Sequence, residues 1–236
     1  MRSLLFAGLA ALALAGFHNL SAQETKSGKV STPINGKDLT GWKVKNDAKK
    51  HKWSIGIAEM DPAKMNQLII KDATDGKGEL VNGNGGGGVD IATEEKFGDC
   101  LLEVELMVPK GSNSGIYLMG EYEVQILDSY GRKNVGPGDI GGLYNAAAPK
   151  LNASKKPGEW QTFIIDFQAP KFEGGKKTSN AKFVKVTLND QVIHENVEMK
   201  GPTPGGLTGK EAPTGPIMFQ GDHGPVAFRN LKVTAK

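Results

Sequence analysis

The amino-acid sequence predicts an all-β protein in which two antiparallel sheets pack face to face as a sandwich. Short apolar runs alternate with turn residues, and the chain of 236 residues contains 32 Gly and 12 Pro. Several runs alternate apolar and polar residues with a period of two, as a strand with one buried face does. No window shows the 3.6-residue apolar period of an amphipathic helix. Short strands at close spacing therefore favour two packed sheets.

The first 22 residues have the layout of a secretory signal. Arg2 supplies a positive charge, residues 4–17 form an apolar run, and the segment ends on the small residue Ala22. The run is too short for a stable membrane span, and no later segment is long and apolar enough for one. We therefore expect cleavage after Ala22 and export, either to the periplasm or out of the cell. A buried N-terminal helix is the alternative interpretation.

Residues 23–236 are predicted to form a single domain, since a β-sandwich of this size commonly folds without splitting. Cys100 is the only cysteine, which excludes an intrachain disulfide, and its neighbours Leu101 and Leu102 predict a buried, unreactive thiol. The formal net charge is +3, and the lysines are scattered among acidic residues. Because no recognition motif is present, this pattern indicates a solvated surface and not a nucleic-acid partner. No feature of the sequence predicts an oligomeric state.

The predicted strands are bounded by turn residues. In 101–108 the apolar side chains at 102, 104, 106 and 108 point to one side, and Glu103 and Glu105 point to the other. Residues 113–115 form a turn, Gly120 separates two strands, and Asn189 with Asp190 forms a tight hairpin connection. Residues 200–216, rich in Pro and Gly, are a long surface loop, and 83–88 (GNGGGG) lack the GK[ST] ending of a phosphate-binding loop. The predicted strands are 101–108, 116–119, 122–127, 160–167, 182–188, 191–197, 216–220 and 226–233.

The most informative stretch is 111–131, GSNSGIYLMGEYEVQILDSYG. Along one continuous strand, a period of two places residues 116, 118, 122, 124 and 126 toward the core. The opposite face then carries Tyr117, Met119, Glu121, Glu123 and Gln125. Carboxyl and amide groups beside an aromatic ring suit a sugar, whose hydroxyls need donors and acceptors and whose apolar faces stack on rings. An ordinary solvated face is the alternative, and Glu103 and Glu105 either extend this face or lie in solvent.

Among the histidines, His223 is the candidate for proton transfer. It lies beside Asp222 in a Gly-rich turn between two apolar strands, and such a turn can hold an imidazole over the end of a sheet. A loop histidine bonded to the backbone is the alternative. His51 and His194 lie in polar, charged surroundings. No metal-ligand spacing is present, although a face of Glu, Asp, Gln and His could hold a divalent cation. The lack of a Gly-x-Ser-x-Gly motif disfavours an α/β-hydrolase mechanism.

Several short motifs follow one another in order along the chain. They are NGKDLTGW at 35–42, NSGIYL at 113–118, YEVQILDS at 122–129, GGLY at 141–144, NA at 152–153, PGEWQT at 157–162, GPT at 201–203, QGDHG at 220–224 and FRN at 228–230. This ordered set is similar to the 3-keto-disaccharide hydrolase domain family, over about residues 34–233. The resemblance implies a concanavalin A-like jelly roll, usually exported, that acts on glycosides oxidised at C3.

The chain departs from the family pattern at Met119, where relatives commonly carry Arg. Methionine cannot bind a carboxylate or a ketone oxygen as Arg does, so a substrate contact at this position would differ from that of the family. A bound divalent cation could take the place of the missing Arg as the electrophile. Cys100 also replaces an aromatic residue, which changes the packing.

The resemblance implies a reaction in which the ketone at C3 acidifies the hydrogen at C2. A base removes this hydrogen, the resulting enolate expels the C1 substituent, and the reaction either stops at the unsaturated sugar or continues by water addition to net hydrolysis. In this interpretation Glu123 is the base, Gln125 and Tyr117 orient or stabilise the oxygen, and His223 assists proton transfer. Asp128 contributes from the end of its strand. Further candidates for substrate contact are Asn113, Met119 and Glu103.

Two alternatives stay open at this point. A retaining glycosidase on the same fold would use Glu123 and Asp128, whose carboxyls would have to lie about 5–5.5 Å apart. An i, i+5 pair on a regular strand faces opposite sides, so a bulge would be needed. A non-catalytic carbohydrate-binding module would bind sugars without turning them over.

Overall fold

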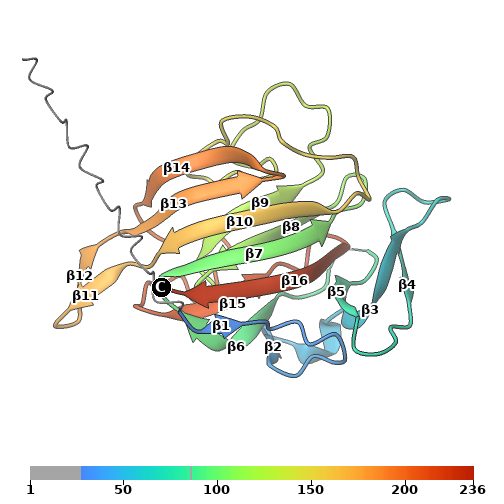
Figure 1. The fold of residues 1–236 in the computed structure, drawn as a ribbon, viewed down its shortest axis with the longest axis horizontal. Helices are drawn as coiled ribbons and strands as arrows, with labels where there is room; N and C mark the ends of the chain where they lie inside the picture. Colours follow the sequence, from blue (N-terminus) through green and yellow to red (C-terminus); the bar gives the residue numbers. More distant parts are fainter. Residues whose placement is uncertain (1–27, 86) are drawn as a thin grey trace, which may run out of the picture.

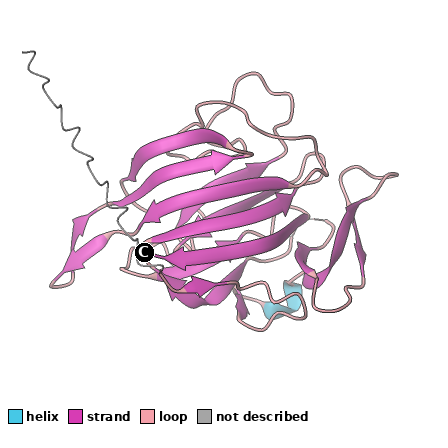
Figure 2. Cartoon of the chain, viewed as in Figure 1, coloured by secondary structure: helices cyan, strands magenta, loops and turns pink. Residues whose placement is uncertain are grey.

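The computed structural model describes residues 28–85 and 87–236, so the predicted signal at 1–22 lies outside the described residues. Within these ranges the chain forms strands and loops, with one short 3-10 helix, η1 (Ala48–Lys50). Two antiparallel sheets lie one behind the other and enclose the core (Figures 1 and 2). The predicted fold class, an all-β jelly-roll sandwich, is confirmed. No helix in this part of the chain is long and apolar enough to cross a membrane.

The larger sheet forms the nearer layer in Figure 1 and contains nine strands within the described residues. They are β1 (Val30–Ser31), β3 (Trp53–Met60), β4 (Leu68–Lys71), β5 (Glu79–Asn82), β7 (Cys100–Met107), β10 (Gln161–Gln168), β13 (Ala181–Leu188), β14 (Gln191–Met199) and β16 (Val226–Ala235). Their order is β14-β13-β10-β7-β16-β5-β3-β4, and β1 pairs with β16.

The smaller layer is a five-stranded sheet behind the larger one in Figure 1. Its strands are β2 (Trp42–Val44), β6 (Ile91–Phe97), β8 (Asn113–Leu118), β9 (Tyr122–Leu127) and β15 (Gly215–Phe219). Their order is β2-β6-β15-β8-β9. A two-stranded ribbon, β11 (Lys171–Glu173) and β12 (Lys176–Ser179), projects from one end of the sandwich (Figure 1). The predicted strands match observed ones to within a few residues, although residues 113–115, predicted as a turn, begin β8. The strands before residue 100, and β11 and β12, were not predicted.

The core lies between the two sheets and is rich in aromatic rings. Phe219 of β15 stacks on Phe228 of β16, with 3.8 Å between the ring centroids, so this pair joins the layers. The side chains at 116, 118, 122, 124 and 126 are all buried in the same cluster, as predicted. Cys100 is also buried, and this burial raises the pKa of its thiol to about 12. The thiol is therefore protonated and unreactive at neutral pH.

The stretch 111–131 forms a hairpin and not one continuous strand. The chain reverses at Met119 and Gly120, which have φ of 56° and 71°, so the left-handed region closes the turn. The register then pairs Tyr117 with Glu123 and Gly115 with Gln125 across β8 and β9. Cross-strand partners share a sheet face. Tyr117, Glu123 and Gln125 therefore lie on one face, as predicted, but they belong to two paired strands and not to one continuous strand.

Two other connections bear on the predictions. Asn189 and Asp190 have φ of 50° and 66°, the paired positive values of a type I′ turn, in agreement with the predicted tight hairpin. Residues 200–216 form a loop from the end of β14 into β15. Leu207 of this loop packs on Ala92 and Tyr117, so the loop lies against the outer face of the five-stranded sheet.

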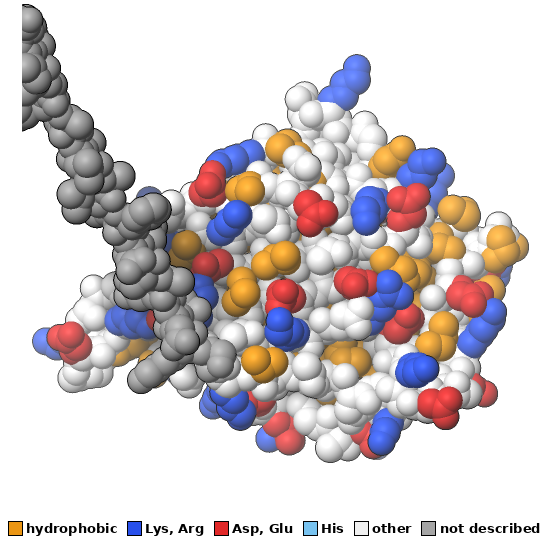
Figure 3. All heavy atoms as spheres, in the orientation of Figure 1, with side chains coloured by type: hydrophobic (Ala, Val, Ile, Leu, Met, Phe, Trp, Pro, Cys, Tyr) orange, Lys and Arg blue, Asp and Glu red, His pale blue; other side chains and the backbone are white. Residues whose placement is uncertain are grey.

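Two sequence-based placements need correction. β7 belongs to the nine-stranded sheet, so Glu103 and Glu105 do not extend the face that carries Glu123. Glu103 instead pairs with Lys232 at 2.7 Å, on a surface where charges of both signs are mixed (Figure 3). His194, expected in polar surroundings, is buried, and its Nε2 hydrogen-bonds Gly141 O at 2.7 Å. This burial lowers its pKa.

Candidate active site

A pocket of about 190 Å³ opens on the outer face of the five-stranded sheet, and we call it the Glu123 pocket. It is lined by residues from β8 and β9, from the segment between β9 and β10, from the 200–216 loop and from the loop after β15. Its lining residues are Asn113, Tyr117, Glu123, Gln125, Tyr144, Pro204, Gly205, Gln220 and His223. The structure therefore brings together five of the residues that the sequence singled out: Asn113, Tyr117, Glu123, Gln125 and His223.

The carboxyl group of Glu123 lies directly over Gly115 of the neighbouring strand. A Cβ at position 115 would come closer than 3.0 Å to Glu123 Oε1, and it would lie 3.0 Å from Glu123 Cδ and from Tyr117 Cε2. Only glycine leaves room for the carboxyl in this position. The motif NSGIYL therefore provides both a ring, at Tyr117, and the space into which Glu123 fits.

The free edge of β9 is covered by the segment 141–144. Gln125 N donates to Gly142 O and Gly141 N donates to Gln125 O, each at 2.8 Å. Tyr144 N then donates to Glu123 O at 3.1 Å, which places Tyr144 beside Glu123. On the same strand, Glu123 N donates to Thr203 Oγ1 at 3.0 Å. Both the N–H and the C=O of Glu123 are thus hydrogen-bonded at the free edge of β9.

Burial changes the acidity of the pocket. Glu123 is only 2 % exposed. This desolvation raises the pKa of its carboxyl to about 7, with Tyr117 opposing the rise as a hydrogen-bond donor and the charges of Asp90 and Asp222 adding to it. The pKa of Tyr117 is raised far above its usual range by burial and by Glu123. At neutral pH, Glu123 can therefore both accept and donate a proton, while Tyr117 stays a neutral donor.

The Tyr117 hydroxyl has two acceptors within reach. It lies 3.4 Å from Pro204 O, and it also interacts with the Glu123 carboxyl. One O–H donates to one acceptor at a time, and an ionised carboxylate is the stronger of the two. We therefore assign the hydroxyl proton to Glu123 when that carboxyl is ionised.

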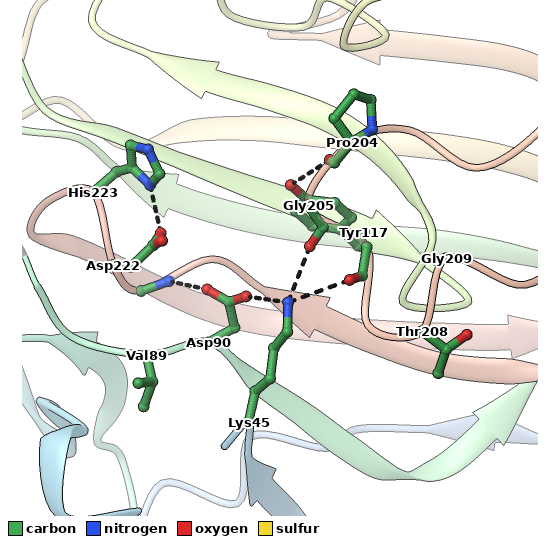
Figure 4. A network of polar contacts seen from close by, with 12 residues as sticks. Lys45, Val89, Asp90, Tyr117, Pro204, Gly205, Thr208, Gly209, Asp222 and His223 are labelled. Atoms are coloured by element: carbon green, nitrogen blue, oxygen red, sulfur yellow. Dashed lines mark hydrogen bonds and ion pairs between the residues drawn. The ribbon is translucent and has the colours of Figure 1, made fainter. Parts of the chain in front are cut away.

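One partly buried ion pair ties together the two loops that frame the pocket (Figure 4). Lys45 Nζ donates to Asp90 Oδ2 at 3.1 Å, to Gly205 O at 3.0 Å and to Gly206 O at 3.3 Å. Asp90 Oδ1 accepts from Gly221 N at 3.0 Å. Gly205 belongs to the 200–216 loop, and Gly221 begins the turn that carries His223. Lys45 and Asp90 therefore set the distance between the two loops.

Glu121 holds the 200–216 loop from the other side. Its carboxylate accepts from Thr208 N at 2.8 Å, from Thr208 Oγ1 at 2.6 Å and from Gly209 N at 2.9 Å. Glu121 O also accepts from Thr203 Oγ1 at 3.0 Å. Glu121 was predicted on the same face as Glu123. Its carboxylate hydrogen-bonds the 200–216 loop and does not line the Glu123 pocket.

Polar groups at the rim and floor of the pocket are available to a ligand. Asn113 Oδ1 and Gln220 Oε1 are buried, and neither has a hydrogen-bond partner within the described ranges. Buried acceptors normally find a donor, so two hydroxyl donors of a ligand would satisfy them. At the mouth, His223 Nδ1 bonds Asp222 Oδ1, and about half of each side chain is exposed. No described group bonds His223 Nε2, so this nitrogen can face a ligand.

Three predicted site residues lie elsewhere. Asp128 follows the end of β9, where Oδ2 accepts from Gly111 N at 2.9 Å and Oδ1 accepts from Tyr130 N at 3.3 Å, so it closes a turn. Met119 sits in the hairpin turn and packs into the core, outside the Glu123 pocket. Met119 therefore contributes nothing to the lining of the Glu123 pocket. Glu103 lies on the other sheet.

Sequence reasoning missed several residues of the site. Three of them, Tyr144, Thr203 and Gln220, lie inside motifs of the ordered set, and this position in a motif was the only sequence signal that could have identified them. Lys45 and Asp90 carried no such signal, because their contacts join segments as much as 161 positions apart. In the part of the chain that the structure describes, no three His, Cys, Asp or Glu side chains are grouped to hold a metal ion.

The fold and the pocket define a β-sandwich protein with a buried carboxyl in a pocket on an outer sheet face. The model of the family described as the 3-keto-alpha-glucoside-1,2-lyase-like domain matches residues 30–234, and the chain belongs to this family. The resemblance drawn from the ordered motifs is thereby confirmed. Family membership supports a function in carbohydrate chemistry. No curated protein matches the chain.

Solved structures with the same fold come from Parabacteroides distasonis. One candidate glycosyl hydrolase from this organism has a TM-score of 0.65 and 29% identity, covering 88% of this chain and 84% of that chain. A second has a TM-score of 0.60 at 17% identity, with coverage of 89% and 94%. A third has a TM-score of 0.57 at 19% identity, with coverage of 88% and 100%. The latter two likenesses establish the fold alone.

Proposed function

We propose that this protein cleaves 3-keto-glycosides, with Glu123 as the base that removes the proton from C2. The observation that carries the proposal is a buried carboxyl with a pKa of about 7 in a pocket on the sheet face. A group with this pKa is half ionised at neutral pH, so it can take up a proton and return it. The family to which the chain belongs supports the same substrate class.

The reaction follows from the acidity of the keto sugar. Glu123 removes the hydrogen at C2, and its bonding electrons form an enolate whose negative charge rests on the C3 oxygen. When the C3 carbonyl forms again, a double bond forms between C1 and C2 and the bond from C1 to the leaving oxygen breaks. The products are an unsaturated keto sugar and an alcohol. Addition of water at C1 would complete a net hydrolysis.

The neighbours of Glu123 suit the enolate oxygen. Tyr117 stays protonated because its pKa is raised, so it can donate a hydrogen bond to a developing anion. Gln125 Oε1 accepts from Ile126 N at 3.0 Å, which leaves the amide nitrogen of Gln125 as a donor toward the pocket. A buried donor aimed at developing charge lowers the barrier by about 3 kcal/mol.

His223 is suited to the leaving group. It stands at the mouth of the pocket, and its Nδ1 is bonded to the Asp222 carboxylate. A carboxylate partner orients the ring and fixes which nitrogen faces the pocket. Nε2 can then deliver a proton to the alcohol as the C1 bond breaks. Asn113 and Gln220 provide acceptors for sugar hydroxyls.

A retaining glycosidase is the less supported alternative. It would need Asp128 as the second carboxyl, and both oxygens of Asp128 accept backbone N–H groups outside the pocket. A binding module without turnover remains the second alternative. It is distinguished by measuring product formation and not binding alone.

The test compares Glu123→Gln with Asp128→Asn on methyl 3-keto-glucoside. Removal of a positioned base lowers the rate by about 10²- to 10⁴-fold, so kcat of Glu123→Gln is expected to fall by that factor. Asp128→Asn, which also exchanges one oxygen for an amide, should stay within about threefold of the wild type. A loss below tenfold in Glu123→Gln excludes the base role. Binding without product in the wild type indicates the binding module, and the product mass separates elimination from hydrolysis.

Export is part of the same proposal. The secretory layout of residues 1–22 supports cleavage after Ala22. N-terminal sequencing of the protein from the periplasm or the medium should begin at Gln23. A protein that keeps Met1 or Arg2 would contradict this placement.

A further inference from the structure

A second and larger pocket lies next to the Glu123 pocket on the same sheet face. Its volume is about 370 Å³, and we call it the Met119 pocket. Ala92 of β6, Met119 of the hairpin turn, Leu207 of the 200–216 loop and Pro216 of β15 give it an apolar lining. A pocket of this size accommodates a ring-sized group.

A thin segment of backbone separates the two pockets. Pro204 and Gly205 line the Glu123 pocket, and Leu207 and Thr208 line the Met119 pocket, so residues 204–208 form a shared wall. A Cβ at Gly205 would lie 2.8 Å from the Tyr117 hydroxyl, and one at Gly206 would come closer than 3.0 Å to Glu121 Oε2. The two glycines therefore let the backbone of this segment lie in direct contact with the side chains of Tyr117 and Glu121.

The Met119 pocket is built for binding and not for proton transfer. The Glu121 carboxylate accepts three hydrogen bonds from Thr208 and Gly209. Glu211 accepts from Tyr122 at 2.6 Å and pairs with Lys177 at 2.6 Å. Glu94 lies 3.6 Å from Lys43. Each carboxylate of the lining is thus already engaged by a protein donor or cation.

Two lysines of the lining have no such partner. Lys96 and Lys210 are exposed, and within the described ranges neither side chain has an ion pair or a hydrogen bond. Over the whole lining, four lysines (43, 45, 96 and 210) stand against three glutamates (94, 121 and 211), so the rim carries a net positive charge. A ligand with an apolar body and an anionic end would complement both the lining and the rim.

We infer that the Met119 pocket binds the leaving group of the glycoside, and that it favours an aromatic group bearing a carboxylate. This inference rests on the proposed function, which places the C1 bond in the adjoining pocket. The sugar would occupy the Glu123 pocket, and the leaving group would cross the wall above Gly205 and Gly206. Apolar contact holds its ring, and Lys96 and Lys210 attract its carboxylate.

The experiment uses methyl, phenyl and 4-carboxyphenyl 3-keto-glucosides with Ala212→Trp. Ala212 is exposed and lines the Met119 pocket, so the indole fills the pocket without disturbing the core. For the two aryl substrates kcat/KM should fall by about 10- to 100-fold relative to wild type, while the methyl glycoside changes less than twofold. Ala63→Trp, the same change at an exposed position in the turn between β3 and β4, should leave all three unchanged.

The lysines are tested separately with Lys96→Gln and Lys210→Gln. Each should lower kcat/KM by about two- to fivefold for the carboxyphenyl substrate only, as expected for an exposed ion pair. An Ala212→Trp variant with unchanged kinetics on both aryl substrates would overturn the inference, as would an equal loss on all three.

A binding measurement keeps the two proposals distinguishable. Titration of 4-hydroxybenzoate into the wild-type protein should show binding that Ala212→Trp abolishes and Ala63→Trp retains. If the wild type cleaves none of the three substrates but shows this pattern, the proposed function fails and the ligand class of the Met119 pocket stands. If 4-hydroxybenzoate does not bind to the wild type, or binds equally to Ala212→Trp, the inference is wrong.

Discussion

Substitution of Gly115 by alanine adds one methyl group directly beside the carboxyl of the proposed base, Glu123. An added Cβ would come closer than 3.0 Å to Glu123 Oε1, and ordinary contact begins at 3.4 Å. In Gly115→Ala the carboxyl therefore has to move by roughly 1 Å. A displacement of this size in a catalytic group costs about 10²-fold in rate, so kcat on methyl 3-keto-glucoside should fall by about that factor.

The same substitution has a limited cost in stability. The φ of Gly115 lies outside the left-handed region, so alanine fits the backbone. Overpacking against Glu123 and Tyr117 costs about 1–3 kcal/mol, which thermal denaturation would detect as a lower but still cooperative transition. The variant therefore stays folded while its activity is measured.

Gly138→Ala is the matched control for this experiment. A Cβ at Gly138 meets no atom within 4 Å, and its φ is also outside the left-handed region. Its kcat should equal that of the wild type. If Gly115→Ala also keeps kcat within about threefold of the wild type, then the carboxyl of Glu123 does not act from its place over Gly115, and the reasoning fails.

Three further predictions concern the charges of the site. Because the base must be ionised and its pKa is about 7, kcat/KM should fall about tenfold for each pH unit below 7, as a pH–rate profile would show. Lys45→Met leaves the Asp90 charge without its partner, which should raise the pKa of Glu123 and move the acid limb of the pH–rate profile to higher pH. Lys45→Arg should return the limb to its wild-type position. A limb that does not move in Lys45→Met would refute the coupling of Lys45 to Glu123 through Asp90. The folded protein binds a proton at Glu123 more tightly than the unfolded chain, for which the carboxyl pKa is 4.5. The stability from this group is therefore full below pH 4.5 and lost as pH rises through 7, and it amounts to about 3 kcal/mol. The free energy of unfolding of Glu123→Gln minus that of the wild type should therefore increase by this amount between pH 4.5 and pH 8. Urea denaturation at both pH values measures this difference. A difference that is the same at both pH values would contradict the prediction.

The face that carries the site was predictable from the sequence for a simple geometric reason. Tyr117 and Glu123 are separated by an even number of positions, and they pair directly across the hairpin. A period of two assigns them to the same face of a straight strand, and the three-residue connection 119–121 keeps that parity in the hairpin. The wrong premise of one continuous strand led to the right face.

Other parts of the site follow no local rule. The alternation in β7 correctly separated Glu103 from the core, but alternation alone does not say which sheet a strand joins. Asp128 follows the last residue of β9, where the backbone N–H groups of Gly111 and Tyr130 take up its oxygens. Lys45 reaches Gly205 only after the loop has packed against the sheet. Such contacts depend on the tertiary fold, which local spacing does not determine.

The buried thiol of Cys100 has a practical consequence for spectroscopy. It is the only cysteine in the sequence and is protonated up to a pH of about 12, so maleimide reagents at neutral pH should leave it untouched. A cysteine introduced on the surface would then be labelled selectively without removing Cys100. A fluorophore attached to the 200–216 loop could follow ligand entry in real time in an otherwise native background.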